Sequence, residues 1–330
     1  MTNCRQIAAA MMAPGKGILA ADESIATMSK RLKDNRVEPT AENRRYYREM
    51  LASAPGLSDD ISGIIFCDET LKQSFSDGKP FPQAVGELGI LAGIKVDTGA
   101  KACPGLDGET ITEGLDDLPA RLAEYAKLGA AFAKWRAVFT IGSETPTQGA
   151  IRSNANALAR YAAACQQAGL VPIVEPEVLM DGSHNLAVCR DVTEEVHTAV
   201  RAELGLLNVD LAGIILKPNM VIEGDGHGRV SSPEEVAEAT VTVLRSWPGA
   251  LAGVAFLSGG QDPERATDNL TAMQRHSTPW PLTFSFGRAL VSPALSAWQG
   301  DPDRRSDGQA TLLNRVKANG AAAGLRAALR

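Results

Sequence analysis

The stretch GIILKPN at residues 213–219 decides the fold. Its apolar run leads directly into Lys217, and Pro218 closes the run. Continuous rather than alternating hydrophobicity is typical of a strand in a parallel sheet that is covered on both faces. We therefore predict a buried strand that ends at a lysine. How that lysine is used depends on what stands at the ends of the other strands.

Seven further stretches share this pattern of four to six mostly apolar residues followed by polar ones. GIILKPN is the core of LAGIILKPN (211–219), and the others are GKGILAADES (15–24), SGIIFCDET (62–70), LAGIKVDTG (91–99), AFAKWRAVF (131–139), LVPIVEPEV (170–178), LAGVAFLSGG (251–260) and PLTFSFGRA (281–289). Helical patterns lie between them, such as the apolar residues at four-residue spacing from Val192 to Leu204. Strand and helix are thus expected to alternate eight times.

Three Ser-Pro or Asp-Pro pairs, at 232–233, 262–263 and 292–293, predict helix starts. Serine and aspartate cap a helix N-terminus, and proline fits the first helical position. At the first of these pairs, Glu235 stands where a capping box requires a glutamate.

Eight strand–helix units predict an α/β protein, a single (β/α)₈ TIM barrel. The main alternative is a doubly wound open sheet. No linker divides the 330 residues, so we expect one domain over 1–330. Gly320 and Gly324 among alanines suggest that residues 301–330 form a loosely packed helical tail.

The composition restricts the class of partner and the compartment. The formal net charge of −6 argues against nucleic acid or an anionic membrane as the main partner. The five cysteines contain no C-x-x-C pair, which favours a reducing compartment and a cytoplasmic protein. No apolar run approaches the ~20 residues that span a bilayer. Residues 7–13 are faintly signal-like, but we expect them to form a helix of the mature protein.

Polar residues stand at the carboxyl ends of seven of the eight predicted strands. They are Asp22, Lys95, Lys134 with Arg136, Glu175 with Glu177, Lys217, Ser258-Gly259-Gly260, and Ser285 with Arg288. One charged residue at a strand end is usually a solvated edge. In a barrel, however, these ends converge on one mouth, so the whole set predicts an active site.

Lys217 has the surroundings of a nucleophilic amine. An apolar strand behind it, with Lys134 as a neighbouring cation, would lower its pKa. Attack on a ketone and loss of water then give an iminium, an electron sink that permits carbon–carbon cleavage. Glu175 and Glu177 share one face of their strand and are candidates for proton transfer. A structural cluster of ion pairs is the alternative interpretation.

Two anion sites can be proposed beside this lysine. In FLSGGQDPE, bare glycine amides precede a helix, and SFGRA adds a glycine and Arg288. Lys95 together with Ser24, Thr27 and Arg31 could form the second site. Two anion sites that flank a nucleophilic lysine would fit a bisphosphorylated ketose.

Seven motifs resemble, in order and spacing, those of class I fructose-bisphosphate aldolase. They are GKGILAADES, IKVD, AKWR, PIVEPE, LKPNM, FLSGGQ and LTFS-GRAL, and the similarity covers roughly residues 5 to 300. The resemblance implies a metal-free, cofactor-free enzyme that cleaves fructose 1,6-bisphosphate to dihydroxyacetone phosphate and glyceraldehyde 3-phosphate. It also implies a homotetramer.

The resemblance further implies a role for each matching residue. Lys217 would form the Schiff base, Asp22 would take the C4 hydroxyl proton with help from Lys134, and Glu175 would be the general acid/base with Glu177 beside it. The C1 phosphate would lie at Ser258, Gly259, Ser285, Gly287 and Arg288, and the C6 phosphate at Ser24, Thr27, Lys95, Arg31 and Arg136.

Three positions depart from the family pattern. The sequence ends in Arg330, and its four tyrosines all lie in the first half, so the terminal tyrosine of animal members has no counterpart. Another group is expected to move the proton at the enamine carbon. Phe286 stands where a tyrosine is frequent, and Thr98 where a lysine is common.

Other functions remain open at this stage. A metal-dependent aldolase would need clustered ligands, whereas the four histidines are scattered. A transaldolase, or a Schiff-base aldolase for sedoheptulose bisphosphate or fructose 1-phosphate, would keep the lysine chemistry. A non-enzymatic scaffold is the alternative of another class.

Overall fold

A computed structural model describes residues 2–328 and contains eight parallel strands in one sheet. The strands are β1 (Gly17–Ala21), β2 (Ile61–Phe66), β3 (Leu91–Lys95), β6 (Phe132–Phe139), β7 (Val171–Val178), β8 (Ile215–Leu216), β9 (Gly253–Phe256) and β10 (Leu282–Phe284). Each lies within one of the eight predicted stretches, except that β2 begins one residue before its stretch. Neighbours in the sheet are neighbours in this order along the chain.

The first and last strands are joined by hydrogen bonds. The Ala20 N–H donates to the Phe286 carbonyl at 3.0 Å. The Thr283 hydroxyl donates to the Lys16 carbonyl at 2.6 Å. These bonds make the sheet a nearly closed barrel, which confirms the predicted TIM barrel over the doubly wound open sheet.

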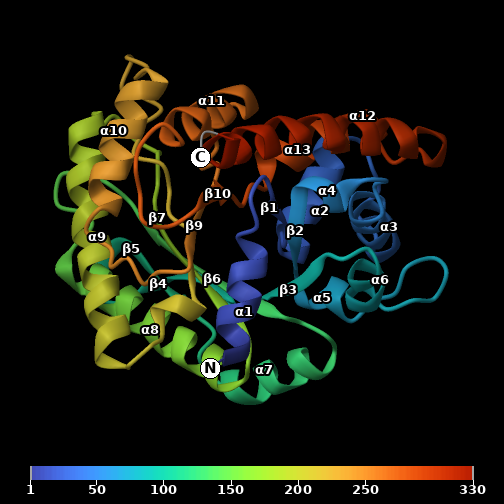
Figure 1. The fold of residues 1–330 in the computed structure, drawn as a ribbon, viewed down its shortest axis with the longest axis horizontal. Coiled ribbons are helices and arrows are strands. Elements are labelled where there is room, and N and C mark those ends of the chain that lie inside the picture. Colours follow the sequence, from blue (N-terminus) through green and yellow to red (C-terminus); the bar gives the residue numbers. More distant parts are fainter. Residues whose placement is uncertain (1, 329–330) are drawn as a thin grey trace.

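Helices surround the barrel (Figure 1). They are α1 (Thr2–Met11), α2 (Ile25–Asp34), α3 (Ala41–Ala52), α4 (Leu57–Asp60), α5 (Asp68–Leu71), α6 (Phe81–Glu87), α7 (Leu118–Lys127), α8 (Gln148–Gln167), α9 (Leu186–Leu206), α10 (Pro233–Leu244), α11 (Pro263–Met273), α12 (Arg288–Trp298) and α13 (Arg305–Ala328). Two short 3₁₀ turns lie at Leu211–Gly213 and Pro302–Arg304. None of the helices within residues 2–328 is long and apolar enough to cross a membrane.

Two of the three predicted helix starts are confirmed. Ser232 caps α10 in a capping box with Glu235, and Asp262 caps α11. The prediction at 292–293 is wrong, because α12 starts at Arg288 and holds Pro293 in its interior. A proline there removes one hydrogen bond inside the helix, and the apolar residues around it, such as Leu290 and Leu295, remain buried.

The barrel interior is filled at its amino-terminal end. Ile18, Phe132 and Ile215 are fully buried there, together with Met11 of α1, which covers that end. The fit is close enough to require glycine: a Cβ on Gly93 would lie 2.1 Å from the Phe132 ring. This packing fills the amino-terminal half of the barrel interior, and the cleft described below lies at the carboxyl-terminal mouth.

An antiparallel hairpin that was not predicted follows β3. It consists of β4 (Gly99–Cys103) and β5 (Leu106–Glu113). The Thr98 N–H donates to the Glu113 carbonyl at 2.9 Å and closes its base. The hairpin brings Gly99 and Ala100 to the mouth of the barrel.

The C-terminal helix α13 packs against its neighbours. It runs alongside α12 (Figure 1) and also contacts α3 and α11. Leu312 and Val316 are fully buried. Residues 305–328 form one helix, and apolar side chains such as Leu312 and Val316 place it against the core. Residues 329–330 lie outside the described residues.

A buried histidine on α9 gives a prediction for stability. His197 is 1% exposed, and its Nδ1 accepts the Trp247 indole N–H at 3.2 Å. Burial, reinforced by Arg201, lowers the pKa of His197 to about 3. This pKa lies below that of a histidine in the unfolded chain. The contribution of His197 to the free energy of unfolding is therefore complete above pH ~6.5 and is lost as the pH falls toward 3.

We expect the free energy of unfolding in urea to drop by about 2 kcal/mol from this group between pH 7 and pH 5. A His197→Gln variant should show a smaller drop, because glutamine does not titrate. An equal pH dependence in both proteins would contradict the assignment.

Candidate active site

All fifteen residues predicted for the site line one cleft of about 390 Å³ at the carboxyl-terminal mouth of the barrel. They are Asp22, Ser24, Thr27, Arg31, Lys95, Lys134, Arg136, Glu175, Glu177, Lys217, Ser258, Gly259, Ser285, Gly287 and Arg288. The strands that carry these residues are apolar where they cross the core. Their polar residues come at the carboxyl end, where each strand reaches the cleft.

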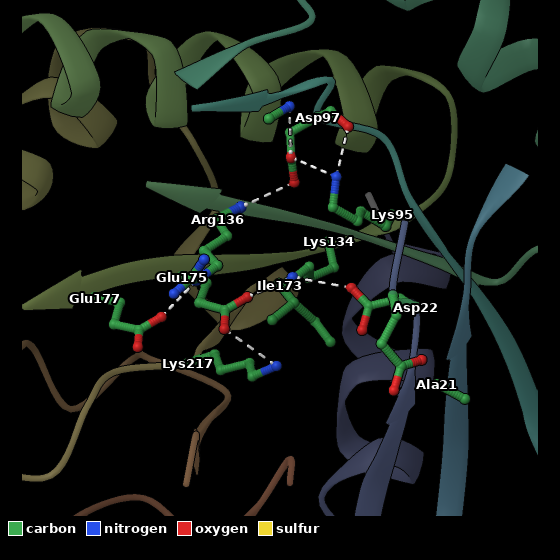
Figure 2. A network of polar contacts seen from close by, with 12 residues as sticks. Ala21, Asp22, Lys95, Asp97, Lys134, Arg136, Ile173, Glu175, Glu177 and Lys217 are labelled. Atoms are coloured by element: carbon green, nitrogen blue, oxygen red, sulfur yellow. Dashed lines mark hydrogen bonds and ion pairs between the residues drawn. The ribbon is translucent and has the colours of Figure 1, made fainter. Parts of the chain in front are cut away.

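Lys134 lies at the centre of this cleft, between two carboxylates (Figure 2). Its Nζ is 2.9 Å from Asp22 Oδ2 and 2.9 Å from Glu175 Oε2. Lys217 Nζ is 3.2 Å from the other oxygen of the same carboxylate, Glu175 Oε1. One carboxylate therefore joins two amines, and both amines and the carboxylate are buried.

The two lysines differ in protonation. Burial opposes the charged form of both. For Lys134 the carboxylates of Asp22 and Glu175 outweigh burial, and its pKa is raised. For Lys217 burial wins and, with Lys134 as a nearby cation, lowers the pKa despite Glu175 and Asp22. Lys134 is thus held as an ammonium, and Lys217 is the amine that is more easily neutral.

Asp22 is held ionised. Burial alone would raise its pKa, but the positive charges of Lys134 and Lys217, with the hydrogen bond from Lys134, lower it to about 2. A carboxylate with so low a pKa is charged throughout the physiological range. It is available to accept a proton from a substrate hydroxyl in the cleft.

At one end of the cleft, every predicted cation has a carboxylate partner. Arg31 Nη1 lies 2.5 Å from Glu23, Lys95 Nζ lies 2.6 Å from Asp97, and Arg136 Nε lies 2.5 Å from Glu177. The Ser24 hydroxyl accepts the Thr27 N–H and so caps α2. An anion here would have to share these cations with their carboxylates.

At the opposite end, glycine backbone and an arginine come together. Gly259 and Gly260 have positive φ values of 56° and 83°, a left-handed backbone conformation that favours glycine. A Cβ on Gly260 would lie 3.0 Å from the Arg288 guanidinium. Arg288 begins α12, whose N-cap Gly287 supplies no side-chain hydrogen bond. Within residues 2–328 no ion pair of Arg288 is found, so this end suits an anion well.

Two functional neighbours were missed from the sequence. Glu23 and Asp97 also line the cleft. Asp97 accepts from Lys95 Nζ, from the Gly99 N–H at 3.1 Å and from the Arg136 N–H at 3.2 Å. The signal was present, because each carboxylate stands within two residues of a predicted polar residue.

The second strand ends outside the cleft. Glu69 binds Arg44 through both carboxylate oxygens, at 2.6 and 2.9 Å, and Asp68 accepts from the Tyr125 hydroxyl at 2.8 Å.

Within the described residues no group of three or more His, Cys, Asp or Glu side chains is arranged to hold a metal ion.

The family model for class I fructose-bisphosphate aldolase, a glycolytic family, matches residues 3–327. The chain belongs to the class I fructose-bisphosphate aldolase family. It is 51% identical to a probable class 1 fructose-bisphosphate aldolase of Xanthomonas campestris over 96% of both chains. It is 53% identical to fructose-bisphosphate aldolase C of Rattus norvegicus, over 96% of this chain and 88% of that one.

Among solved structures, the Plasmodium falciparum fructose-bisphosphate aldolase superimposes on the chain with a TM-score of 0.96. The two share 44% identity, over 98% of this chain and 94% of that one. The resemblance to the aldolase family that was read from seven motifs is therefore confirmed. The matched region contains every residue of the cleft.

Proposed function

We propose that the chain cleaves fructose 1,6-bisphosphate reversibly to dihydroxyacetone phosphate and glyceraldehyde 3-phosphate through a Schiff base on Lys217. The observation that carries the proposal is the contrast between the two lysines of the cleft. Burial lowers the pKa of Lys217, while two carboxylates raise that of Lys134. Only a neutral amine has the lone pair needed to attack a ketone. The family membership supports the same reaction.

The proposed steps assign the proton transfers of dehydration and of carbon–carbon cleavage to two carboxylates. The Lys217 amine adds to the C2 carbonyl, and Glu175, 3.2 Å from Nζ, takes a proton from the added nitrogen and gives it to the C2 hydroxyl, which leaves as water. Asp22 takes the C4 hydroxyl proton, the C3–C4 bond breaks, and its electron pair moves toward the iminium nitrogen. Glyceraldehyde 3-phosphate leaves. The enamine is then protonated at C3 and hydrolysed to dihydroxyacetone phosphate.

The test is reductive trapping. Borohydride with dihydroxyacetone phosphate is expected to inactivate the enzyme irreversibly and to modify one peptide, the one that contains Lys217. A metal-dependent aldolase would not be trapped, and a non-enzymatic scaffold would show neither trapping nor turnover. Modification of Lys134 instead would contradict the proposal.

The anion sites give a prediction about substrate choice. We assign the C1 phosphate to the end with Arg288 and the C6 phosphate to the end with Lys95. Loss of a charged hydrogen bond is expected to weaken binding by about 1.5–3 kcal/mol, roughly 10- to 150-fold in KM. Arg288→Ala should raise KM for both fructose 1,6-bisphosphate and fructose 1-phosphate.

Lys95→Met is the matched control at the other end. It should raise KM for the bisphosphate and leave that for fructose 1-phosphate nearly unchanged. Another phosphorylated ketose, such as sedoheptulose bisphosphate, is the alternative substrate. Comparison of kcat/KM for these ketoses, in the wild type and in both variants, tests that alternative. If removal of the C6 phosphate has no effect on the wild type's kcat/KM, the second anion site is wrong.

The proposal extends to assembly and location. The family resemblance supports a homotetramer, and five cysteines without a disulfide among them support a cytoplasmic enzyme. Sedimentation equilibrium tests the first, because a species of one chain at working concentration would contradict it.

A further inference from the structure

A fully buried arginine lies behind the first strand of the barrel. Arg48 on α3 is 0% exposed. A buried charge is costly unless it is hydrogen-bonded and paired, so its partners indicate why it is placed there. Two of those partners are backbone carbonyls at the end of β1. Nε donates to the Ala21 carbonyl at 3.2 Å, and Nη2 donates to the Glu23 carbonyl at 2.7 Å.

These carbonyls belong to the residues on either side of Asp22. At this point the chain leaves β1 and turns into α2. One rigid guanidinium therefore holds the peptide unit that precedes Asp22 and the one that follows Glu23. With the backbone fixed on both sides, the Asp22 carboxylate is directed toward Lys134 Nζ, 2.9 Å away.

Two carboxylates lie near the guanidinium and balance its charge. Arg48 Nη1 lies 3.6 Å from Glu69 Oε2, and Nη2 lies 3.9 Å from Glu23 Oε2. Both carboxylates have a closer partner of their own: Arg44 for Glu69 and Arg31 for Glu23. The shortest contacts of Arg48 are thus the two carbonyls. The carboxylates balance its charge from a greater distance and do not fix its position.

We propose that Arg48 is a positioning residue for Asp22 in carbon–carbon cleavage. Arg48 is not expected to touch the substrate. It acts on Asp22 through the backbone carbonyls of Ala21 and Glu23. The inference rests on the proposed function, because it assigns Arg48 to the step in which Asp22 takes the C4 hydroxyl proton. It predicts a defect in cleavage that spares the formation of the iminium.

The test is Arg48→Lys, because one ammonium cannot reach both carbonyls with the geometry of a planar fork. A displacement of a catalytic group by about 1 Å can reduce rate about 100-fold. We expect kcat for cleavage of fructose 1,6-bisphosphate to fall roughly 10- to 100-fold. Borohydride trapping of the dihydroxyacetone phosphate iminium, which needs no proton transfer to Asp22, should change less than about twofold. Rates are expressed per trappable site, so unfolded protein does not count.

Arg44→Lys is the matched control. Arg44 is on the same helix and binds the same Glu69, but it donates to no carbonyl at the end of β1. Its cleavage rate per trappable site should stay near that of the wild type. An equal loss in both variants would mean that the ion cluster, rather than the contact to β1, is responsible, and would overturn the proposal.

A double-mutant cycle with Asp22→Asn separates positioning from general damage. If Arg48 acts through Asp22, adding Arg48→Lys to Asp22→Asn should cause little further loss of kcat. A full additional loss contradicts the proposal. If Arg48→Lys and Arg48→Gln both fail to trap the iminium, Arg48 serves folding and the proposal is wrong. If the wild type itself is not trapped, the proposed function has failed instead.

Discussion

Replacing Lys217 by arginine is expected to reduce kcat roughly 10⁴-fold or more. The guanidinium stays protonated at any pH the protein tolerates and cannot form a carbinolamine with a ketone. In the wild type the opposite holds, because burial and Lys134 lower the pKa of the Lys217 amine. Measurement of kcat with fructose 1,6-bisphosphate, and of incorporated label after borohydride with dihydroxyacetone phosphate, checks both parts of the claim.

Two variants make this result specific to the amine. Lys217→Met removes the charge at similar length and should be as inactive as Lys217→Arg. Lys134→Arg keeps a cation between Asp22 and Glu175 and should still be labelled at position 217. Undiminished turnover in Lys217→Arg, or label that moves to another peptide, would show that the covalent scheme is wrong.

The strand ends could be predicted because the signal is local. Each strand of a barrel is buried until it reaches the mouth, so the first charged residue after an apolar run marks the boundary of the core. Lys217, Glu175 and Asp22 follow this rule and lie in the cleft. Parallel strands bring all their carboxyl ends together, which is why residues far apart in sequence could be grouped without coordinates.

Pairing between charges could not be predicted in the same way. The sequence predicted that the cations at 31, 95 and 136 bind a phosphate, and it did not assign a carboxylate partner to each of them. The structure pairs each with a carboxylate, at distances that depend on strand stagger and on the turns after β1 and β3. The sequence predicted a lowered pKa for Lys217, but not the contacts that raise the pKa of Lys134. The difference between the two lysines arises from two contacts of 2.9 Å at Lys134 against one of 3.2 Å at Lys217.

Two features that do not follow from the alternation of strand and helix were also harder to predict: the β4–β5 hairpin and the start of α12. The hairpin at 99–113 is mostly exposed and carries no apolar run. Pro293 was interpreted as a helix start, yet α12 begins five residues earlier, at Arg288, with Gly287 at the N-cap position. In both cases tertiary position overrides a local signal.

Replacing Glu175 by glutamine is expected to lower kcat by about 10²–10⁴-fold, the usual contribution of a general acid/base. Glu175 is the one carboxylate of the described residues that contacts both lysines, at 2.9 Å and 3.2 Å. Glutamine keeps the shape and a hydrogen-bond acceptor but transfers no proton. Carbinolamine dehydration should then limit the rate, and the rate of borohydride trapping should fall together with kcat.

The pH profile of that variant separates proton transfer from electrostatics. The negative charge of Glu175 raises the pKa of Lys217 against the effect of burial. Removing this charge therefore lowers that pKa further, and the acid limb of the trapping rate should move to lower pH. The amine would be neutral over a wider range and yet react more slowly. A limb that moves to higher pH would contradict the electrostatic assignment.

Glu177→Gln is the matched control for Glu175→Gln. Glu177 lies two residues further along β7 and is paired with Arg136 at 2.5 Å, with no ion pair to either lysine among residues 2–328. Its loss should disturb the C6 end of the cleft, and KM more than the trapping rate. If instead Glu177→Gln slows trapping as much as Glu175→Gln does, proton transfer at the Schiff base is shared between the two carboxylates. The single bridging role assigned to Glu175 would then be wrong.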